Sequence, residues 1–227
     1  MRKALKMSHE HDVVSKDALL GYQAELRDTG TVVIPPGTLF TQDELARIDQ
    51  LQRDIPEEEV RKGDANDSHS VFVKRIRANY PGCHPSDVNG VASAQIIELL
   101  EGAARPAALK KIFGASSQYV IRRCQMHRMV PGSFIGLHLD AASDPDFAYS
   151  VIVQLARDFE GGEFVVYPRP RETQVFRPSF GSVVITSCKY AHEVRPVRRG
   201  ERRTLVYFHS AHAGTNRRSI EKPNVDA

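Results

Sequence analysis

The sequence is poor in cysteine: among its 227 residues there are three, Cys83, Cys124 and Cys188, and no two form a Cys-x-x-Cys pair. The odd number and wide spacing argue against a disulfide framework and against a cysteine-ligated zinc site. Long apolar runs are also missing, because none approaches the roughly 20 residues of a membrane-spanning helix. No apolar stretch follows the basic residues near the N-terminus, as a secretory signal would require. We therefore expect a cytoplasmic protein without a membrane partner.

A strong charge of either sign is absent as well. The formal net charge is +3, and the basic residues are dispersed along the chain, so no nucleic-acid partner is predicted. The length suffices for one domain with a sizeable core. We expect a disordered leader at residues 1–14, an N-terminal helical support at 15–118, a β-rich core at 119–210 and a flexible tail at 211–227, with 15–210 forming one compact domain.

The N-terminal part combines helices with short strands. Helical periodicity and capping residues predict helices at 16–27, 41–55, 93–101 and 106–113. Apolar runs predict strands at 31–34 and 71–76. Residues 57–85 contain a charged stretch rich in Gly, Asp and Asn, followed by Asn79 and Tyr80. This segment is predicted to be either a lid over a pocket or an ordinary surface loop.

The following part shows a run of short strands with regular turn signals, at 119–129, 149–155, 162–167, 173–176, 182–186, 192–197 and 203–208. This pattern predicts a mainly β fold with flanking helices, in which the strands form a sandwich or barrel. Because side chains two residues apart share one face of a strand, one inward-facing set is expected: Arg123, Gln125, His127, Met129, Ser150, Ile152 and Gln154.

The strongest chemical signal is His138-Leu139-Asp140 together with the distant His192. Two imidazoles and one carboxylate leave three positions open on one face of an octahedral metal, as non-haem Fe(II) oxygenases require. His138 and Asp140 should project to the same side of a strand. Taken alone, a His-x-Asp sequence is a weak signal, and a surface histidine near a turn is the more common reading.

The surrounding residues give this pattern its context. Four segments follow one another: MVPGSFIGLHLD at 129–140, DFEGGEF at 158–164, FGSVVI at 180–185 and HEVRPVRRGER at 192–202. Their order resembles the 2-oxoglutarate/Fe(II) dioxygenase superfamily, most closely its prolyl-hydroxylase-like branch, over residues 119–210. The resemblance implies a double-stranded β-helix core of the jelly-roll or cupin-like type. It also implies Fe(II) as the metal, with 2-oxoglutarate and O2 as co-substrates.

The resemblance assigns roles to individual residues. His138, Asp140 and His192 would be the metal ligands and the catalytic centre. A basic residue about ten positions after the second histidine would bind the distal carboxylate of 2-oxoglutarate, and that position is Arg202. Arg203 is the rival, but alternation places Thr204 on the face of Arg202, where its hydroxyl could reach the same carboxylate. Related halogenases have a small residue in place of Asp140, so the carboxylate here favours hydroxylation.

The sequence departs from its relatives at Met129, which replaces a tyrosine that helps to hold the co-substrate. A thioether cannot donate that hydrogen bond, so Gln154 or Gln125 is expected to supply the donor. His127 is either a substrate contact or a hydrogen-bonded structural histidine.

The predicted function is hydroxylation of an unactivated C–H bond in a small polar substrate, such as an amino acid or a natural-product intermediate. The expected substrate contacts are Arg123, His127, Asn79 and Tyr80. Desaturation, cyclisation, demethylation or a peptidyl substrate would use the same cofactors, and sequence does not separate these outcomes. The alternative outside catalysis is a metal-binding sensory β-helix module. The oligomeric state is not predicted.

Overall fold

The computed structural model describes residues 15–64, 66–102, 104–116 and 119–219. The predicted leader at 1–14 and the end of the predicted tail at 220–227 lie outside these residues. Four α-helices are present, α1 (Lys16–Thr29), α2 (Gln42–Leu51), α3 (Gly90–Glu101) and α4 (Arg105–Ile112), with a 3-10 turn η1 (Gln52–Asp54) after α2. Thr41 and Glu44 form both hydrogen bonds of a capping box at the start of α2. The four predicted helices are thus confirmed.

Strands make up most of the remaining chain. They are β1 (Thr31–Ile34), β2 (Glu58–Lys62), β3 (Ser68–Ala78), β4 (Ser86–Asp87), β5 (Val120–Met129), β6 (Phe134–His138), β7 (Tyr149–Gln154), β8 (Phe159–Gly161), β9 (Phe164–Tyr167), β10 (Gln174–Phe176), β11 (Val183–Ser187), β12 (Ala191–Val194), β13 (Val197–Gly200) and β14 (Arg202–Ser210). A second 3-10 turn, η2 (Asp140–Ala142), follows β6. None of the helices in the described residues is long and apolar enough to cross a membrane.

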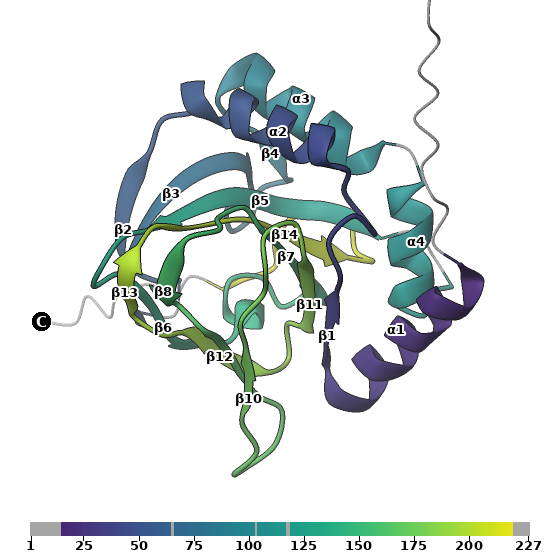
Figure 1. The fold of residues 1–227 in the computed structure, drawn as a ribbon. Helices are drawn as coiled ribbons and strands as arrows, with labels where there is room; N and C mark the ends of the chain where they lie inside the picture. The colour runs from purple at the N-terminus through teal and green to yellow at the C-terminus, as the bar shows by residue number, and fades with distance from the viewer. Residues whose placement is uncertain (1–14, 65, 103, 117–118, 220–227) are drawn as a thin grey trace, which may run out of the picture.

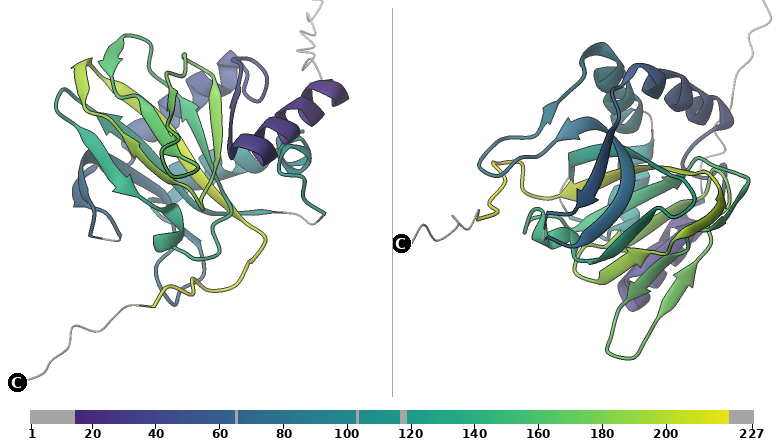
Figure 2. Two further views of the ribbon diagram at one scale, coloured as in Figure 1. Left: turned by 90° about the horizontal axis from the view of Figure 1, so that it is seen from below. Right: turned by 90° about the vertical axis from the view of Figure 1, so that its left-hand side faces the viewer.

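One antiparallel hydrogen-bonded path runs through the sheet in the order β1-β11-β7-β14-β5-β3-β6-β12-β9-β10. The long strand β3 forms the corner, because one stretch of it pairs with β5 and its beginning pairs with β6. The sheet therefore curls on itself, and the helices lie outside the curl (Figures 1 and 2). This is the double-stranded β-helix predicted from the sequence. Since β1 and β3 belong to it, the sheet is not confined to the predicted core at 119–210.

Alternating side chains of the central strands serve two apolar clusters. Leu205 and Tyr207 of β14 pack toward the helices, whereas Val206 and Phe208 face the interior of the curl. This period of two is what a strand covered on both faces requires. Polar residues lie beside the inner apolar cluster, and they form the candidate active site.

The segment expected to be a lid or a loop is instead a β-hairpin. β2 pairs with β3 in register from Glu58 opposite Val73 to Lys62 opposite Ser68. β2 is an edge strand whose side chains are mostly exposed and charged, so it lacks the apolar alternation by which a strand is recognised. Residues of the hairpin help to line the interior cavity.

The described part of the predicted flexible tail is held in place. Arg122 is fully buried and donates from Nη1 to the carbonyl of His212 at 3.0 Å and from Nη2 to Asp144 at 3.0 Å. Asn216 donates to the backbone carbonyls of Asn79 and Ser143. A buried cation and buried backbone carbonyls thus satisfy one another. The prediction of a flexible tail is wrong for residues 211–219.

Candidate active site

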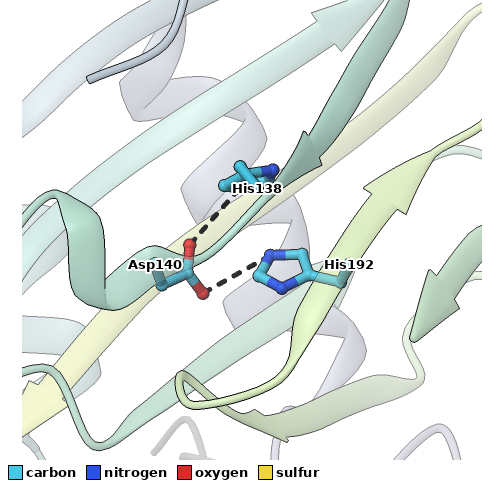
Figure 3. Close-up of side chains that lie close together, drawn as sticks. All are labelled: His138, Asp140 and His192. Atoms are coloured by element: carbon cyan, nitrogen blue, oxygen red, sulfur yellow. Dashed lines mark ion pairs between the residues drawn. The ribbon is translucent and has the colours of Figure 1, made fainter. Parts of the chain in front are cut away.

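The two candidate histidine ligands lie opposite each other on neighbouring strands. His138 at the end of β6 pairs in register with His192 of β12. The ring centroids are 4.3 Å apart. The sequence predicted that Asp140 lies on the same strand as His138, and this is wrong. β6 ends at His138, and Asp140 begins η2. Leu139 keeps an extended backbone with φ −117° and ψ 127°, so Asp140 still returns to the side of His138 (Figure 3).

Hydrogen bonds to the backbone fix the orientation of both imidazoles. Nδ1 of His138 lies 2.8 Å from the carbonyl oxygen of Gly136, and Nδ1 of His192 lies 3.0 Å from that of Tyr190. Because a carbonyl only accepts, each Nδ1 carries a proton, and Nε2 is the ring nitrogen that faces the candidate metal position. Such outer contacts are typical of metal-binding histidines.

The carboxylate of Asp140 lies between the two imidazoles. Its oxygens are 3.5 Å from Nε2 of His138 and 3.5 Å from Nε2 of His192. Burial opposes its ionisation, but both histidines hold the pKa of Asp140 far below its usual value. Burial and the adjacent Asp140 raise the pKa of the Cys188 thiol well above its ordinary range.

The three residues have the donor set that a divalent iron needs. Their candidate ligand atoms all lie within 4.8 Å of one another, and Oδ2 of Asp140 is buried without a hydrogen-bond partner among the described residues. Two imidazole nitrogens and one carboxylate oxygen fit a facial triad that leaves three positions open.

Arg202 is a buried cation that pairs with no carboxylate among the described residues. Its side chain points into the curl from β14 and is 2% exposed. Nη1 lies 3.5 Å from the sulfur of Met129, and Nε has no hydrogen-bond partner among the described residues. Burial lowers the pKa of Arg202 to about 10. A buried guanidinium of this kind is suited to pairing with the carboxylate of a bound molecule.

The neighbours of Arg202 agree with the predicted alternation. Thr204 also faces inward, and its hydroxyl is buried without a partner in the described part of the chain. Arg203 faces outward and pairs with Asp49 at 2.7 Å. Gly162 makes room for the aliphatic part of the Arg202 side chain, because a Cβ on Gly162 would lie 2.8 Å from Cδ of Arg202.

Most of the predicted inward set lines the same cavity as the metal triad and Arg202. Its members there are Arg123, Gln125, His127, Ser150 and Ile152. Nε2 of Gln125 lies 2.6 Å from Nε2 of His127. Burial, together with the charge of Arg202, lowers the pKa of His127 to about 3. His127 is therefore a neutral imidazole at physiological pH.

Three predicted site residues lie outside this cavity. Gln154 is buried and in register with Thr204, but it is not among the residues that line the cavity, and its Nε2 lies 3.4 Å from the carbonyl of Ala156. The side chain of Asn79 donates to Asp144 at 2.7 Å and accepts from Arg122. Tyr80 is 52% exposed on the surface. The predicted roles of Asn79 and Tyr80 as substrate contacts do not fit these positions, and the role of Gln154 stays a prediction.

The sequence analysis missed the contribution of the hairpin. Asp64, Asp67, His69 and Arg75 line the cavity from β3 and the turn before it. Nε2 of His69 lies 2.9 Å from Asp67, and its ring lies edge-on to His138 with centroids 5.5 Å apart. The alternation at 71–76 continues back to His69, and this signal could have revealed its inward direction.

Known proteins share this arrangement of sequence and structure. A family model described as the 2OG-Fe(II) oxygenase superfamily matches residues 124–210. A solved structure from Burkholderia pseudomallei, an oxidoreductase of the 2OG-Fe(II) oxygenase family, is 49% identical. The match covers 90% of this chain and 96% of that chain, with a TM-score of 0.85. The chain belongs to the 2OG-Fe(II) oxygenase family. This oxygenase is therefore a 2-oxoglutarate-dependent dioxygenase that uses Fe(II), as predicted.

More distant structures share the fold of this oxygenase. A Pseudomonas putida prolyl-4-hydroxylase is 16% identical, with 86% of this chain and 99% of that chain covered and a TM-score of 0.61. The epimerase SnoN from nogalamycin biosynthesis is 16% identical, with 94% and 92% covered and a TM-score of 0.68. A search of curated proteins found no match.

Proposed function

We propose that this oxygenase hydroxylates an unactivated C–H bond of a small polar molecule, such as a free amino acid or a natural-product intermediate, and releases succinate and CO2. One observation carries the proposal. The metal triad, the unpaired Arg202 and the polar side chains of β5 all line a single cavity. Buried polar groups need hydrogen-bond partners, and iron with 2-oxoglutarate would use only some of them.

The assignment of roles follows from the geometry. His138, Asp140 and His192 would hold Fe(II) through two Nε2 atoms and a carboxylate oxygen. Fe(II) and 2-oxoglutarate, when bound, supply the oxidising power that places one atom of O2 in the C–H bond and the other in succinate. Arg202 would pair with the distal carboxylate of the co-substrate through its guanidinium, with the Thr204 hydroxyl as a second donor.

Of the two glutamines considered for the donor that Met129 lacks, Gln125 is the one that lines the cavity. Gln125 contacts His127, which burial and the charge of Arg202 keep neutral. They can orient polar groups by hydrogen bonds without adding a charge beside Arg202.

Hydroxylation is favoured over halogenation because the carboxylate of Asp140 occupies the position at which halogenases leave a site for chloride. A small substrate is favoured over a peptide because the β2–β3 hairpin contributes to the wall of the cavity that holds the metal triad. A peptide would instead need an open groove or a free sheet edge leading to the metal.

The test is turnover of 2-oxoglutarate and mass spectrometry of a small-molecule cell extract incubated with Fe(II) and the enzyme. We expect succinate formation and a metabolite that gains one oxygen atom. Asp140→Ala should lose both and bind less iron, whereas Asp146→Ala, a control in the loop after Asp140 whose side chain pairs with Arg217, should keep both. A metabolite that loses two hydrogens instead would show desaturation or cyclisation. Full activity of Asp140→Ala would refute the assigned triad.

A further inference from the structure

The inward face of β5 and β14 forms a ladder with a cation at each end. Arg202 pairs in register with Met129, Thr204 with His127, Val206 with Gln125 and Phe208 with Arg123. Met129 lies six positions after Arg123 on β5, which corresponds to roughly 20 Å along the strand. Both arginines line the same cavity. One guanidinium is therefore available at each end of the ladder.

The metal triad lies beside the middle of this ladder. His138, Asp140 and Arg202 all act electrostatically on His127. Arg123 is four residues farther along β5, roughly 13 Å from His127 along the strand. Between them stands Gln125, which is uncharged. A molecule bound outward of the iron would thus meet Arg123 as the cation at its far end.

The guanidinium of Arg123 has spare capacity for an anion. Nη1 donates to Asp64 at 3.0 Å, and this is the one hydrogen bond that its guanidinium makes within the described residues. Asp64 is shared, because its other oxygen lies 2.9 Å from Nη1 of Arg218. Two guanidiniums therefore share this one carboxylate. The side chain of Arg123 is 15% exposed, and it lines the cavity.

We infer that the substrate carries a carboxylate, and that Arg123 binds this carboxylate at the outer end of the cavity while the C–H bond to be oxidised lies toward the iron. The inference rests on the proposed function and narrows its substrate class to carboxylate-bearing small molecules. Arg123 would act as a specificity residue, with Asp64 and Arg218 fixing its position. A planar guanidinium suits this role because it can form two parallel hydrogen bonds to a carboxylate.

The experiment uses two forms of one probe, the small-molecule fraction of a cell extract, either native or with its carboxylates converted to methyl esters. Pure 2-oxoglutarate and Fe(II) are added after esterification. Mass spectrometry then measures the metabolite that gains one oxygen atom. We expect the product from the native fraction, and at least about tenfold less from the esterified fraction, because a charge-assisted bidentate contact is lost. Equal conversion of both fractions would overturn the inference.

Variants locate the effect. Arg123→Gln should lower oxidation of the native fraction by about tenfold or more, with the dissociation constant for 2-oxoglutarate unchanged. Arg123→Lys keeps the positive charge but loses the bidentate geometry of the guanidinium, so a several-fold reduction of oxidation is expected. This variant tests the role of Arg123 if Arg123→Gln does not fold. Arg128→Gln is the matched control, since Arg128 lies on β5 but faces outward to Glu57.

The remaining outcomes are also decisive. Wild-type rates in the Arg123 variants would refute the role of Arg123. A weakened binding of 2-oxoglutarate in these variants, with Arg202→Met binding normally, would place the co-substrate at Arg123 and overturn the inference. Succinate formation without an oxidised small molecule in either fraction would refute the proposed small-molecule substrate, and the inference would fail with it.

Discussion

Replacing Arg202 with methionine should have opposite effects on stability and on co-substrate binding. The guanidinium is 2% exposed and faces no carboxylate in the described residues. Burial lowers the pKa of Arg202 to about 10, so the folded state holds the proton less tightly than the unfolded chain. This difference corresponds to a cost of about 3 kcal/mol, which is complete below pH 10 and is relieved as the pH rises above it.

Methionine has a similar length and no charge, so Arg202→Met should stabilise the ligand-free protein by up to about 3 kcal/mol. Binding of 2-oxoglutarate should weaken by about 3–5 kcal/mol, or roughly two to three and a half powers of ten, because a buried carboxylate would lose its partner. Urea unfolding of the metal-free protein measures the first effect. Anaerobic calorimetry with Fe(II) and 2-oxoglutarate measures the second.

Arg203→Met is the matched control on the same strand. Arg203 faces outward and pairs with Asp49 near the surface, so its loss should cost less than about 1 kcal/mol and leave 2-oxoglutarate binding unchanged. Two results would refute the reasoning. One is unchanged binding of 2-oxoglutarate by Arg202→Met, and the other is a large loss of stability in the ligand-free variant.

Further predictions concern buried groups away from the iron. The imidazole of His209 has no hydrogen-bond partner among the described residues, and burial lowers its pKa to about 3. The unfolded chain therefore takes up a proton first, and stability falls as the pH drops from about 6.5 toward 3, by about 1.4 kcal/mol per pH unit. His209→Phe, which keeps the ring contacts with Phe113 and Tyr207, should reduce the stability difference between pH 7 and pH 5 in urea unfolding; an unchanged difference would contradict the lowered pKa. Asp144→Ala should destabilise the fold by about 3–5 kcal/mol because Arg122 would stay buried without its partner, and the double variant Arg122→Met with Asp144→Ala should recover part of this loss. Thermal unfolding tests both, and additive losses in the double variant would show that the pair is not coupled.

Sequence reasoning succeeded where the physical rule was local. The period of two along β5 and β14 separated the inward Arg202 and Thr204 from the outward Arg203, and it placed Arg123, Gln125 and His127 inside the curl. Alternation depends on backbone geometry alone, so it needs no knowledge of distant partners. The capping box of Thr41 and Glu44 is local in the same sense.

The errors arose where a residue's role depends on a distant partner. The polar residues after 210 resemble a flexible tail, yet they are ordered by Arg122, a residue 90 positions away from His212. Asn79 was predicted to contact the substrate because it is polar and lies in a loop. Its side-chain amide is instead hydrogen-bonded to Arg122 and Asp144. β2 was not predicted because its exposed, charged residues show no strand pattern of their own. Its strand conformation depends on pairing with β3.

The tip of the β2–β3 hairpin lines the cavity but belongs to none of the strands that carry the metal ligands. β2 is hydrogen-bonded to β3 alone, whereas the metal ligands come from β6, β12 and the turn after β6. Insertions, deletions or exchanges at the hairpin tip would therefore break no ladder that carries a metal ligand. Substrate range can diversify at this tip while the oxidative chemistry stays the same. The tip is also the place at which a library for a new substrate should be randomised, with the strands behind it left untouched.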